Sequence, residues 1–325
     1  MLHHAERAVA AYPIQAPILS FIRHNENMTC KVTDQASGAH FLLRIHRSAT
    51  AGLSGMQHEL AGLQAEMALL RELDRQGTLR VQKPVPNRNG EYVTTYRSEE
   101  LGTVYATMLE WVDGETLAEA TPDDQLACKL GENLADLHRY SRSCAAPDMA
   151  RPSYGAKRID DALGILEYGV EAGVYSAEQF AIIREVLGLV KQQMRELDTR
   201  GGAFGLIHSD FQRNNVVVAE GRNPVFIDYC LYGNGYYLFD VGSAATMFKG
   251  EARKAFLKGY ASKEASFSAA DIRFIEGQIL WDIFISYSLF IKDAERGSWI
   301  KDHAARICGT LALDFIAGKN VFDAF

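Results

Sequence analysis

The sequence lacks a long uninterrupted hydrophobic run, and this absence excludes two classes of protein. The most apolar stretch, ILWDIFISYSLFI at 279–291, is too short to span a bilayer and carries Asp282 near its start, so it predicts a buried helix. The first residues, MLHHAERAVAAY, carry charges where a secretory signal needs a continuous apolar segment. We therefore expect a protein that neither spans a membrane nor is exported, located in the cytoplasm.

Cysteine is scarce, and its placement argues against a disulfide framework and a zinc site. The chain has five cysteines, an odd number, with no C-x-x-C pair and no histidine at the spacing of a zinc ligand. They are scattered at Cys30, Cys128, Cys144, Cys230 and Cys308. This pattern is typical of a protein of the reducing cytoplasm.

The sequence also lacks an excess of basic over acidic residues. The 34 Lys and Arg residues face 41 Asp and Glu residues, for a formal net charge of −7. Nucleic-acid binding requires a basic surface that displaces counterions from phosphates, so we expect no nucleic-acid partner. With 325 residues, of which 47% are hydrophobic, the chain is long enough for two packed lobes.

The first third of the chain has the pattern of a sheet with one helix. Apolar residues recur at helical spacing through MQHELAGLQAEMALLREL, which begins at Met56. Strands are predicted on alternation and β-branched content at 28–34, 40–47, 92–97 and 102–112. The Asp113-Gly114 pair is a turn signal, and we place the boundary there, with lobes at 1–112 and 113–325.

The remainder is predicted to be mainly helical. One helix is expected to start with Thr121 as its cap and Pro122 in the first position, and another covers 176–198. Ser268 and Asp271 have the spacing of a capping box that opens the last helices. Between these helices, NNVVVAEGRNPVFIDY predicts two short strands joined as a hairpin. The predicted fold class is α+β.

A polar cluster lies at the ends of this hairpin. His208, Asp210 and Asn215 precede its first strand, and Asp228 ends the second, so the hairpin should bring them together. Asparagine and aspartate offer only oxygen ligands, which suit Mg²⁺ and its shared phosphates. Taken alone, Asp210 and Asn215 could equally cap a local turn, and Asn214 is the alternative ligand if the loop is shifted by one residue.

These residues carry a resemblance to a known family. HSDFQRNN followed by VFIDY resembles the H-x-D-x-x-x-x-N and following aspartate of the aminoglycoside phosphotransferase and choline kinase-like family, which includes homoserine kinase type II-like enzymes and is related to protein kinases. HFLLRIHRS, LQAEMALLREL, MLEWVDGETL and YLFDVGSA are similar to further family segments, in the right order. The resemblance implies a two-lobed protein-kinase-like fold, with a β-rich N-terminal nucleotide-binding lobe and a mainly helical C-terminal lobe.

The resemblance also implies roles for individual residues. It implies that Asp210 orients the acceptor hydroxyl and takes its proton, and that Asn215 and Asp228 bind Mg²⁺. It also implies that ATP is bound by Arg44, by its partner Glu66 and by the hinge residues Glu110 and Val112. His208 and Asp240 are implied to support the catalytic loop. Asp282 is implied to lie in the acceptor pocket.

The sequence differs in three places from protein kinases and from many of their relatives. Arg44 stands where many relatives have lysine, and arginine can also bind phosphate oxygens. The turn RHNENMT at 23–29 contains no glycine, so Asn25 and Asn27 side chains are the candidates to replace backbone contacts to phosphate. IDYC stands where protein kinases have D-F-G, which argues against a kinase-style activation switch.

Two of these residues could also have an ordinary structural role without any part in catalysis. Arg44 could be an ordinary strand arginine that faces water, and Glu59 lies on a face of the helix similar to that of Glu66. The preference for Glu66 rests on the resemblance.

The predicted function is transfer of the γ-phosphate of Mg²⁺-ATP to a hydroxyl of a small molecule. Amino alcohols, homoserine-like metabolites and aminoglycoside-type antibiotics are the candidate acceptors, and no membrane partner is expected. A protein serine/threonine kinase of the same fold and a nucleotide-binding pseudokinase are the alternatives, the latter because of Arg44 and the glycine-free turn. The sequence does not indicate the oligomeric state.

Overall fold

The computed structural model describes residues 2–24, 27–46, 55–144, 150–295 and 297–325. The chain divides into two compact units. Unit 1 comprises Met1–Ala120, Met149–Arg151 and Asn214–Leu231, and unit 2 comprises Thr121–Asp148, Pro152–Arg213 and Tyr232–Phe325. The predicted lobe boundary between residues 112 and 113 stays a prediction.

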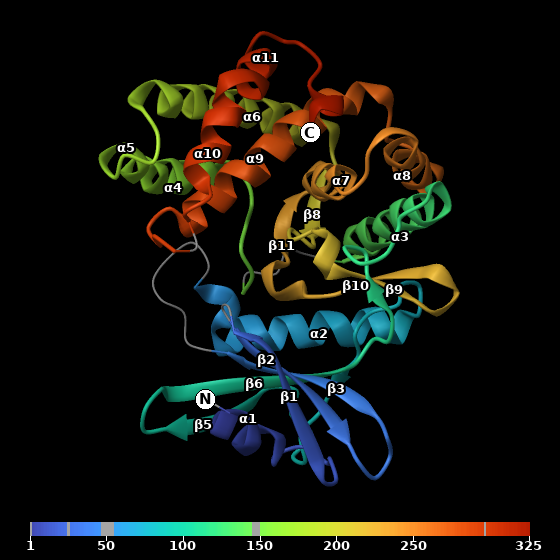
Figure 1. The fold of residues 1–325 in the computed structure, drawn as a ribbon. Helices are drawn as coiled ribbons and strands as arrows, with labels where there is room; N and C mark the ends of the chain where they lie inside the picture. The colour runs from blue at the N-terminus through green and yellow to red at the C-terminus, as the bar shows by residue number, and fades with distance from the viewer. Residues whose placement is uncertain (1, 25–26, 47–54, 145–149, 296) are drawn as a thin grey trace. The chain divides into compact units, whose positions relative to one another are not determined.

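Unit 1 is built on an antiparallel sheet with the order β1-β2-β3-β6-β4, in which β5 also pairs with β6 (Figure 1). The strands are β1 (Pro17–His24), β2 (Asn27–Asp34), β3 (His40–His46), β4 (Pro84–Val85), β5 (Thr94–Ser98) and β6 (Gly102–Glu110). One face of β1, β2, β3 and β6 packs against helix α1 (Leu2–Val9), and Tyr12, Cys30 and Leu43 are fully buried in this core. The sequence pattern did not predict α1.

The helix α2 (Leu60–Gln76) forms within the segment whose periodicity predicts it, but it begins later than Met56, and Met56 and Leu60 at the start of the pattern are exposed. Leu63, Met67 and Leu70 are buried, and the helix ends at Gly77, whose φ of 65° suits the left-handed C-terminal position. Glu66, which borders the apolar stripe, is 0% exposed, whereas Glu59 precedes the first residue of α2 and is exposed.

The predicted hairpin also belongs to unit 1. β9 (Val216–Ala219) and β10 (Asn223–Phe226) pair antiparallel, and β7 (Glu115–Thr116) adds a third strand against β9. Gly114, which precedes β7, has φ +148°, and a Cβ at this position would lie 2.4 Å from the carbonyl oxygen of Val218. Only glycine permits this approach, so the Asp113-Gly114 turn fixes the path of the chain against the hairpin.

Unit 2 is mainly helical. Its helices are α3 (Asp124–Ser143), α4 (Ala156–Leu166), α5 (Tyr168–Glu171), α6 (Ala177–Arg200), α7 (Tyr237–Thr246), α8 (Gly250–Lys263), α9 (Ile272–Phe290), α10 (Ile300–Arg306) and α11 (Ala312–Ile316). Two short strands, β8 (Phe204–Ile207) and β11 (Gly233–Tyr236), pair antiparallel. α9 packs against α4, α6 and α7, and Trp281, Phe284 and Tyr287 are buried completely in that core.

The caps of unit 2 correct one expectation and confirm another. The cap of α3 is Asp123, whose carboxylate accepts a hydrogen bond from the backbone N–H of Leu126 at 2.8 Å, so the expectation of Thr121 was wrong. The helix begins only at Asp124, so Pro122 is not in its first position either, because the carboxylate of Asp123 satisfies the free N–H of the first turn. The predicted capping box of Ser268 and Asp271 is present.

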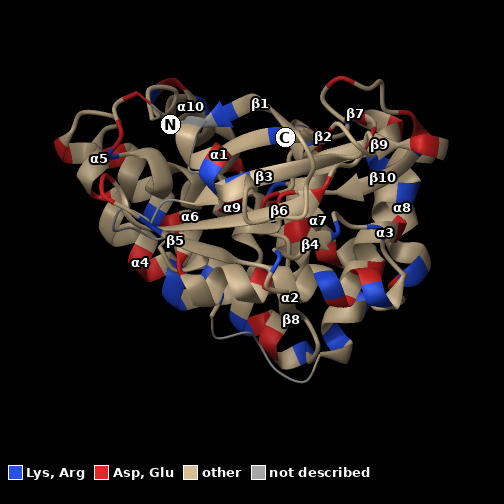
Figure 2. Ribbon diagram, turned by 90° about the horizontal axis from the view of Figure 1, so that it is seen from below, with Lys and Arg blue, Asp and Glu red and all other residues tan. Residues whose placement is uncertain are grey.

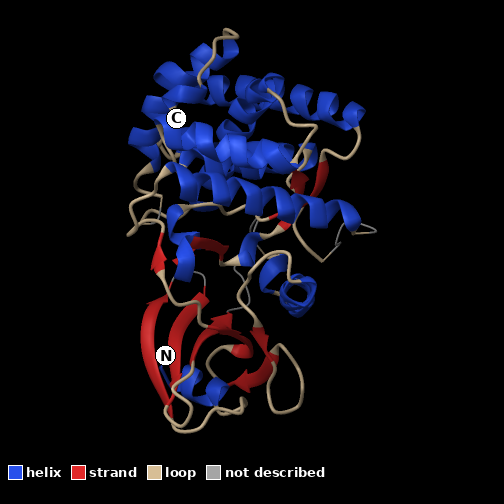
Figure 3. Cartoon of the chain, turned by 90° about the vertical axis from the view of Figure 1, so that its right-hand side faces the viewer, coloured by secondary structure: helices blue, strands red, loops and turns tan. Residues whose placement is uncertain are grey.

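The predicted fold class is confirmed. Figure 3 shows a sheet of long strands in unit 1, whereas helices dominate unit 2, which has only two short strands among the described residues. Lysine, arginine and acidic residues are interspersed along the elements of both units (Figure 2). Among the described residues, no helix is both long enough and apolar enough to cross a membrane.

Candidate active site

The first part of the site is a buried ion pair in unit 1. Arg44 lies on β3 and Glu66 on α2, and Nη2 of Arg44 is 2.8 Å from Oε1 of Glu66. Arg44 is only 3% exposed, so the alternative of an ordinary strand arginine in water is wrong. Burial by itself lowers the pKa of Arg44, but the carboxylates of Glu66 and Asp228 outweigh it and raise the pKa, so the guanidinium stays charged.

The position of Arg44 is fixed from the neighbouring strand as well. Arg44 lies opposite Thr107 of β6, and its Nε donates to Oγ1 of Thr107 at 3.2 Å. Glu66 and Thr107 therefore hold two edges of the guanidinium. Among the described residues Nη1 finds no hydrogen-bond acceptor, although it lies 3.8 Å from Oδ1 of Asp228.

A histidine that the sequence motifs did not single out completes this network. His46 is fully buried, with Nδ1 3.0 Å from Oδ1 of Asn27 and Nε2 2.9 Å from Oγ1 of Thr107. Burial, with a contribution from Arg44, lowers its pKa well below the usual value, so the ring is neutral. Because the amide oxygen of Asn27 can only accept, Nδ1 carries the proton, and the Thr107 hydroxyl donates to Nε2.

The sequence did contain a signal for His46. Residues two apart on a strand point to the same face, so the spacing of Arg44 and His46 places both side chains together. The partner Thr107 could not be found this way, because it lies 63 positions away and depends on the strand register.

Asn215 and Asp228 lie at the open end of the hairpin, directly before β9 and shortly after β10. The backbone N–H of Ile227 donates to the carbonyl oxygen of Asn215 at 3.0 Å, which joins Asn215 to the residue before Asp228 at the adjoining ends of the two strands. Asn215 is buried, and Asp228 is 24% exposed by side chain. Asp228 has φ 61°, a left-handed conformation that costs energy in a residue other than glycine and occurs at functional sites.

Asp228 carries a contact that the sequence did not predict. Nη2 of Arg23, on β1, donates to Oδ2 of Asp228 at 2.9 Å. Arg44 approaches the other oxygen of the same carboxylate at 3.8 Å. Asp228 therefore lies between two guanidinium groups.

Arg151 holds the segment after Asp228, and no motif pointed to it. Its buried guanidinium donates to the carbonyl oxygen of Gly62 on α2 at 2.9 Å, and to the carbonyl oxygens of Tyr229 and Cys230. It thereby ties the helix that carries Glu66 to the residues that follow Asp228. Cys230 is buried beside this cluster, which raises the pKa of its thiol and leaves it unreactive.

The predicted hinge residues lie at the end of β6. The backbone N–H of Glu110 donates to the carbonyl oxygen of Lys83 at 2.8 Å and is committed to the fold. Among the described residues the backbone of Val112 makes no hydrogen bond. Val112 thus has the free N–H and C=O groups that an adenine edge requires.

In unit 2, Asp240 holds the predicted catalytic loop in shape. Its fully buried carboxylate accepts hydrogen bonds from the backbone N–H groups of His208 at 2.7 Å and Ser209 at 2.8 Å. Nε2 of His138 lies 3.3 Å from the same carboxylate. Ser209 has φ 59°, so this clamp holds a strained backbone directly before Asp210.

Asp210 follows this clamp with a partly exposed side chain. Its carboxylate accepts a hydrogen bond from Nε2 of Gln212 at 3.2 Å, and its backbone N–H donates to Nδ1 of His208 at 3.3 Å. His208 is fully buried and its ring packs on Phe211, which fits support of the loop. The structure thus brings His208, Asp210 and Asp240 together, as the motif predicts.

Asp282 lies beside this loop support. On α9, its Oδ2 accepts a hydrogen bond from the hydroxyl of Ser243 on α7 at 2.5 Å. Burial, with a contribution from the charge of Asp240, raises the pKa of Asp282 to about 6. A carboxylate that is costly to ionise and partly accessible is a candidate for recognition of a cation.

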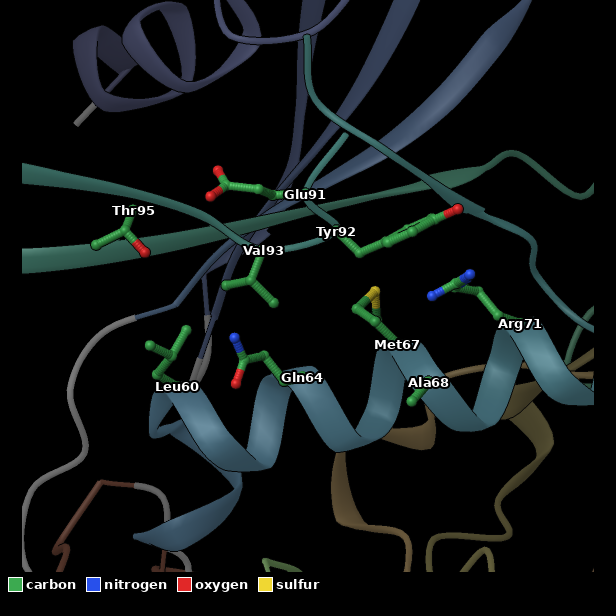
Figure 4. A pocket seen from close by; sticks show the side chains of 9 residues that line it. All are labelled: Leu60, Gln64, Met67, Ala68, Arg71, Glu91, Tyr92, Val93 and Thr95. Carbon is green, nitrogen blue, oxygen red and sulfur yellow. The ribbon is translucent and has the colours of Figure 1, made fainter. Parts of the chain in front are cut away.

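A separate hollow of about 350 Å³ lies on another face of α2 (Figure 4). Met67, Arg71 and Tyr92 are among its lining residues, and the guanidinium of Arg71 lies 4.2 Å from the ring centre of Tyr92. None of the predicted site residues lines it. We assign it no part in the chemistry.

Comparison with known families matches this arrangement. The sequence profile described as the phosphotransferase enzyme family matches residues 19–275, which include Arg44, Glu66, Asp210 and Asp228. The chain belongs to the phosphotransferase enzyme family. It is a phosphotransferase, as the sequence resemblance implied. No curated protein sequence matches it significantly.

Solved structures of small-molecule kinases have the same fold. A microcompartment-associated aminopropanol kinase is 22% identical, with a TM-score of 0.76 over 98% of each chain. An amicoumacin kinase is 18% identical, with a TM-score of 0.71 over 93% of each chain. A choline kinase from Cryptosporidium parvum Iowa II is 15% identical, with a TM-score of 0.64 over 97% of this chain and 98% of the other.

The metal-ligand oxygens and the hydrogen-bond donor described in unit 1 fit a magnesium-bound triphosphate. Asn215 and Asp228 offer amide and carboxylate oxygens, which a hard divalent cation prefers. Nη1 of Arg44 is a buried charged donor that lacks an acceptor among the described residues, and a phosphate oxygen would supply one. The residues present therefore fit both the magnesium ion and the triphosphate.

Proposed function

We propose that this phosphotransferase uses Mg²⁺-ATP as its phosphoryl donor and a small amino alcohol as its acceptor. The observation that carries the proposal is the buried Arg44–Glu66 pair of 2.8 Å beside Asp228 at the end of a hairpin. A structural ion pair of this kind gains little stability from burial, whereas a fixed cation is useful for binding phosphate.

The chain would bind the donor through several groups in unit 1. Arg44 would bind phosphate oxygens, held in place by Glu66 and Thr107. Val112 would meet the adenine with its backbone. Asn215 and Asp228 would hold the magnesium ion, which neutralises phosphate charge.

Unit 2 would supply the group that acts on the acceptor. Asp210 would orient the acceptor hydroxyl and take its proton while the hydroxyl oxygen bonds to the γ-phosphorus and the bond from that phosphorus to the bridging oxygen of ADP breaks. His208 and Asp240 would keep the loop in position through the hydrogen bonds described above.

An amino alcohol is favoured among the candidate acceptors because Asp282 can pair with its ammonium group. The relatives named above include an aminopropanol kinase and a choline kinase, both named for acceptors that carry a cationic nitrogen. Homoserine-like metabolites also carry an ammonium group. Aminoglycoside-type antibiotics carry several, and they form the remaining class for the test.

The experiment is a measurement of ADP release from Mg²⁺-ATP with a panel of hydroxyl compounds. The panel contains aminopropanol, ethanolamine, choline, homoserine and aminoglycosides, each with an amine-free alcohol of similar size as its control. We expect an amino alcohol to stimulate ADP release and to yield a phosphate ester detectable by ³¹P NMR. If no compound raises ADP release above the rate without acceptor, the proposal fails.

Asp282→Asn is expected to stabilise the protein at pH 7. The pKa of Asp282 is raised from 3.8 to about 6, so the folded state binds the proton more tightly than the unfolded state does. The favourable contribution is complete below pH 3.8 and is lost as the pH rises through about 6. At pH 7 the variant should therefore gain about 1–3 kcal/mol in the free energy of unfolding, measured by urea denaturation.

The same variant should bind a cationic acceptor more weakly than wild type. We expect the KM for a cationic acceptor to rise in Asp282→Asn, and the wild-type KM to fall as the pH increases through about 6. Asp302→Asn, an exposed change on α10, is the control. A gain in stability without a change in KM would place Asp282 outside the acceptor pocket.

A further inference from the structure

Arg23 makes a contact that the proposed function does not use. Its Nη2 donates to Oδ2 of Asp228 at 2.9 Å across 205 positions of sequence. Asp228 is the residue expected to hold magnesium, and here one of its oxygens is already bound by a guanidinium. An Arg23 in this position competes with a metal for the carboxylate.

The two arginines around Asp228 differ in how firmly they are held. Arg44 is buried and fixed by Glu66 and Thr107. Arg23 is 48% exposed by side chain, and among the described residues its ion pair with Asp228 is the only one it makes. A half-exposed arginine held at one point can change rotamer at little cost, so Arg23 is free to exchange partners.

The glycine-free turn also needs a phosphate-binding group. Asn25 lies outside the described residues. Asn27 points into the unit, with its amide oxygen 3.0 Å from His46 and its Nδ2 3.8 Å from Sγ of Cys230. Asn27 is therefore committed to the buried network, and Arg23, at the end of β1, is the cation that borders the turn.

Charge balance favours an exchange. Arg23 and Arg44 carry two positive charges, and Glu66 and Asp228 carry two negative charges, so these four side chains are neutral together. Mg²⁺-ATP brings net negative charge and a cation that needs the oxygens of Asp228. If Arg23 turns to the phosphates, it pairs with the arriving charge and releases Asp228.

The geometry points to Arg23 as a phosphate-binding residue that shields Asp228 in the nucleotide-free enzyme and moves to the triphosphate when Mg²⁺-nucleotide binds. This inference rests on the proposed function, because it takes Mg²⁺-ATP as the donor. It assigns to one side chain the contact that glycine backbone provides in other kinases.

The test compares Arg23→Gln with wild type in two binding measurements that need no turnover. Calorimetry with Mg²⁺-AMP-PNP should show affinity weaker by about 10- to 100-fold, since a charge-assisted contact to phosphate is lost. Titration of the nucleotide-free protein with Mn²⁺, followed by electron paramagnetic resonance, should show tighter metal binding than in wild type, because Asp228 is no longer occupied.

Controls separate this role from a structural one. Arg97→Gln removes an exposed charge from β5 in the same sheet and should change neither measurement. Arg23→Lys should recover part of the nucleotide affinity, which a defect in folding would not allow.

Each result decides between the two proposals. If wild type binds Mg²⁺-AMP-PNP and Arg23→Gln binds both nucleotide and Mn²⁺ equally well, the role of Arg23 is overturned while the proposed function stands. If wild type itself does not bind Mg²⁺-AMP-PNP, the proposed donor is wrong and the role of Arg23 is overturned with it.

Discussion

Replacing Asp210 by asparagine is expected to reduce kcat by about 10²- to 10⁴-fold. The asparagine amide keeps the size of the side chain but cannot take the proton of the acceptor hydroxyl. The backbone around it is held by Asp240 through the N–H groups of His208 and Ser209, so the loop should keep its conformation. The loss should therefore appear in the chemical step.

The measurement is steady-state turnover together with nucleotide binding. Because Asp210 belongs to unit 2, whereas Arg44, Glu66 and Asp228, which we propose bind the nucleotide, belong to unit 1, the Kd for Mg²⁺-AMP-PNP should match that of wild type. Asp161→Asn, an exposed change on α4, is the matched control for the loss of one carboxylate. If Asp210→Asn retains most of the wild-type kcat, Asp210 is not the residue that takes the proton.

Local sequence patterns predicted the elements that carry the site. The apolar stripe predicts α2 and its inward face, but it does not separate Glu66 from Glu59, which lies two turns earlier on a similar face. Glu59 is exposed because the helix begins after it. The hairpin signal around Gly221 brings Asn215 next to the residues before Asp228. These features depend on periodicity and on turn chemistry, and both can be read within a window of about 20 residues.

The partners of these residues could not be predicted in the same way. Arg23 meets Asp228 across 205 positions, and Thr107 meets Arg44 across 63. Such contacts depend on strand order and register, which no local pattern encodes. Arg151 is a further case. It belongs to unit 1, and it holds backbone carbonyl groups of Gly62 and Tyr229 although both are far from it in the sequence.

The start of α3 shows why even a local signal can mislead. Three capping residues surround Pro122, and the sequence does not say which of them is the cap. In the structure the carboxylate of Asp123 accepts the N–H of Leu126, so the helix begins at Asp124. The competition is decided by a few tenths of a kcal/mol between similar caps, and propensity alone does not resolve such differences.

Glu66→Gln is expected to lower the free energy of unfolding by about 3–5 kcal/mol, because it leaves the buried charge of Arg44 without its close partner. Asp228 lies 3.8 Å from Nη1 of Arg44 and compensates only in part. A loss of this size corresponds to a fall in Tm of roughly 10 °C for a domain of this kind. Thermal denaturation of the nucleotide-free protein, followed by circular dichroism, measures it.

A control on the same helix and a double variant test the cause. Glu72 forms an exposed ion pair with Arg75, so Glu72→Gln should leave Tm unchanged. Arg44→Met combined with Glu66→Leu removes both buried charges, and we expect it to recover most of the lost stability. It should nevertheless bind Mg²⁺-AMP-PNP poorly. If Glu66→Gln melts like wild type, the pair is not the strong buried interaction that its geometry indicates. If the double variant recovers stability but not nucleotide binding, two apolar side chains stabilise the fold as well as the ion pair does. The ion pair is then required for phosphate recognition and not for the fold.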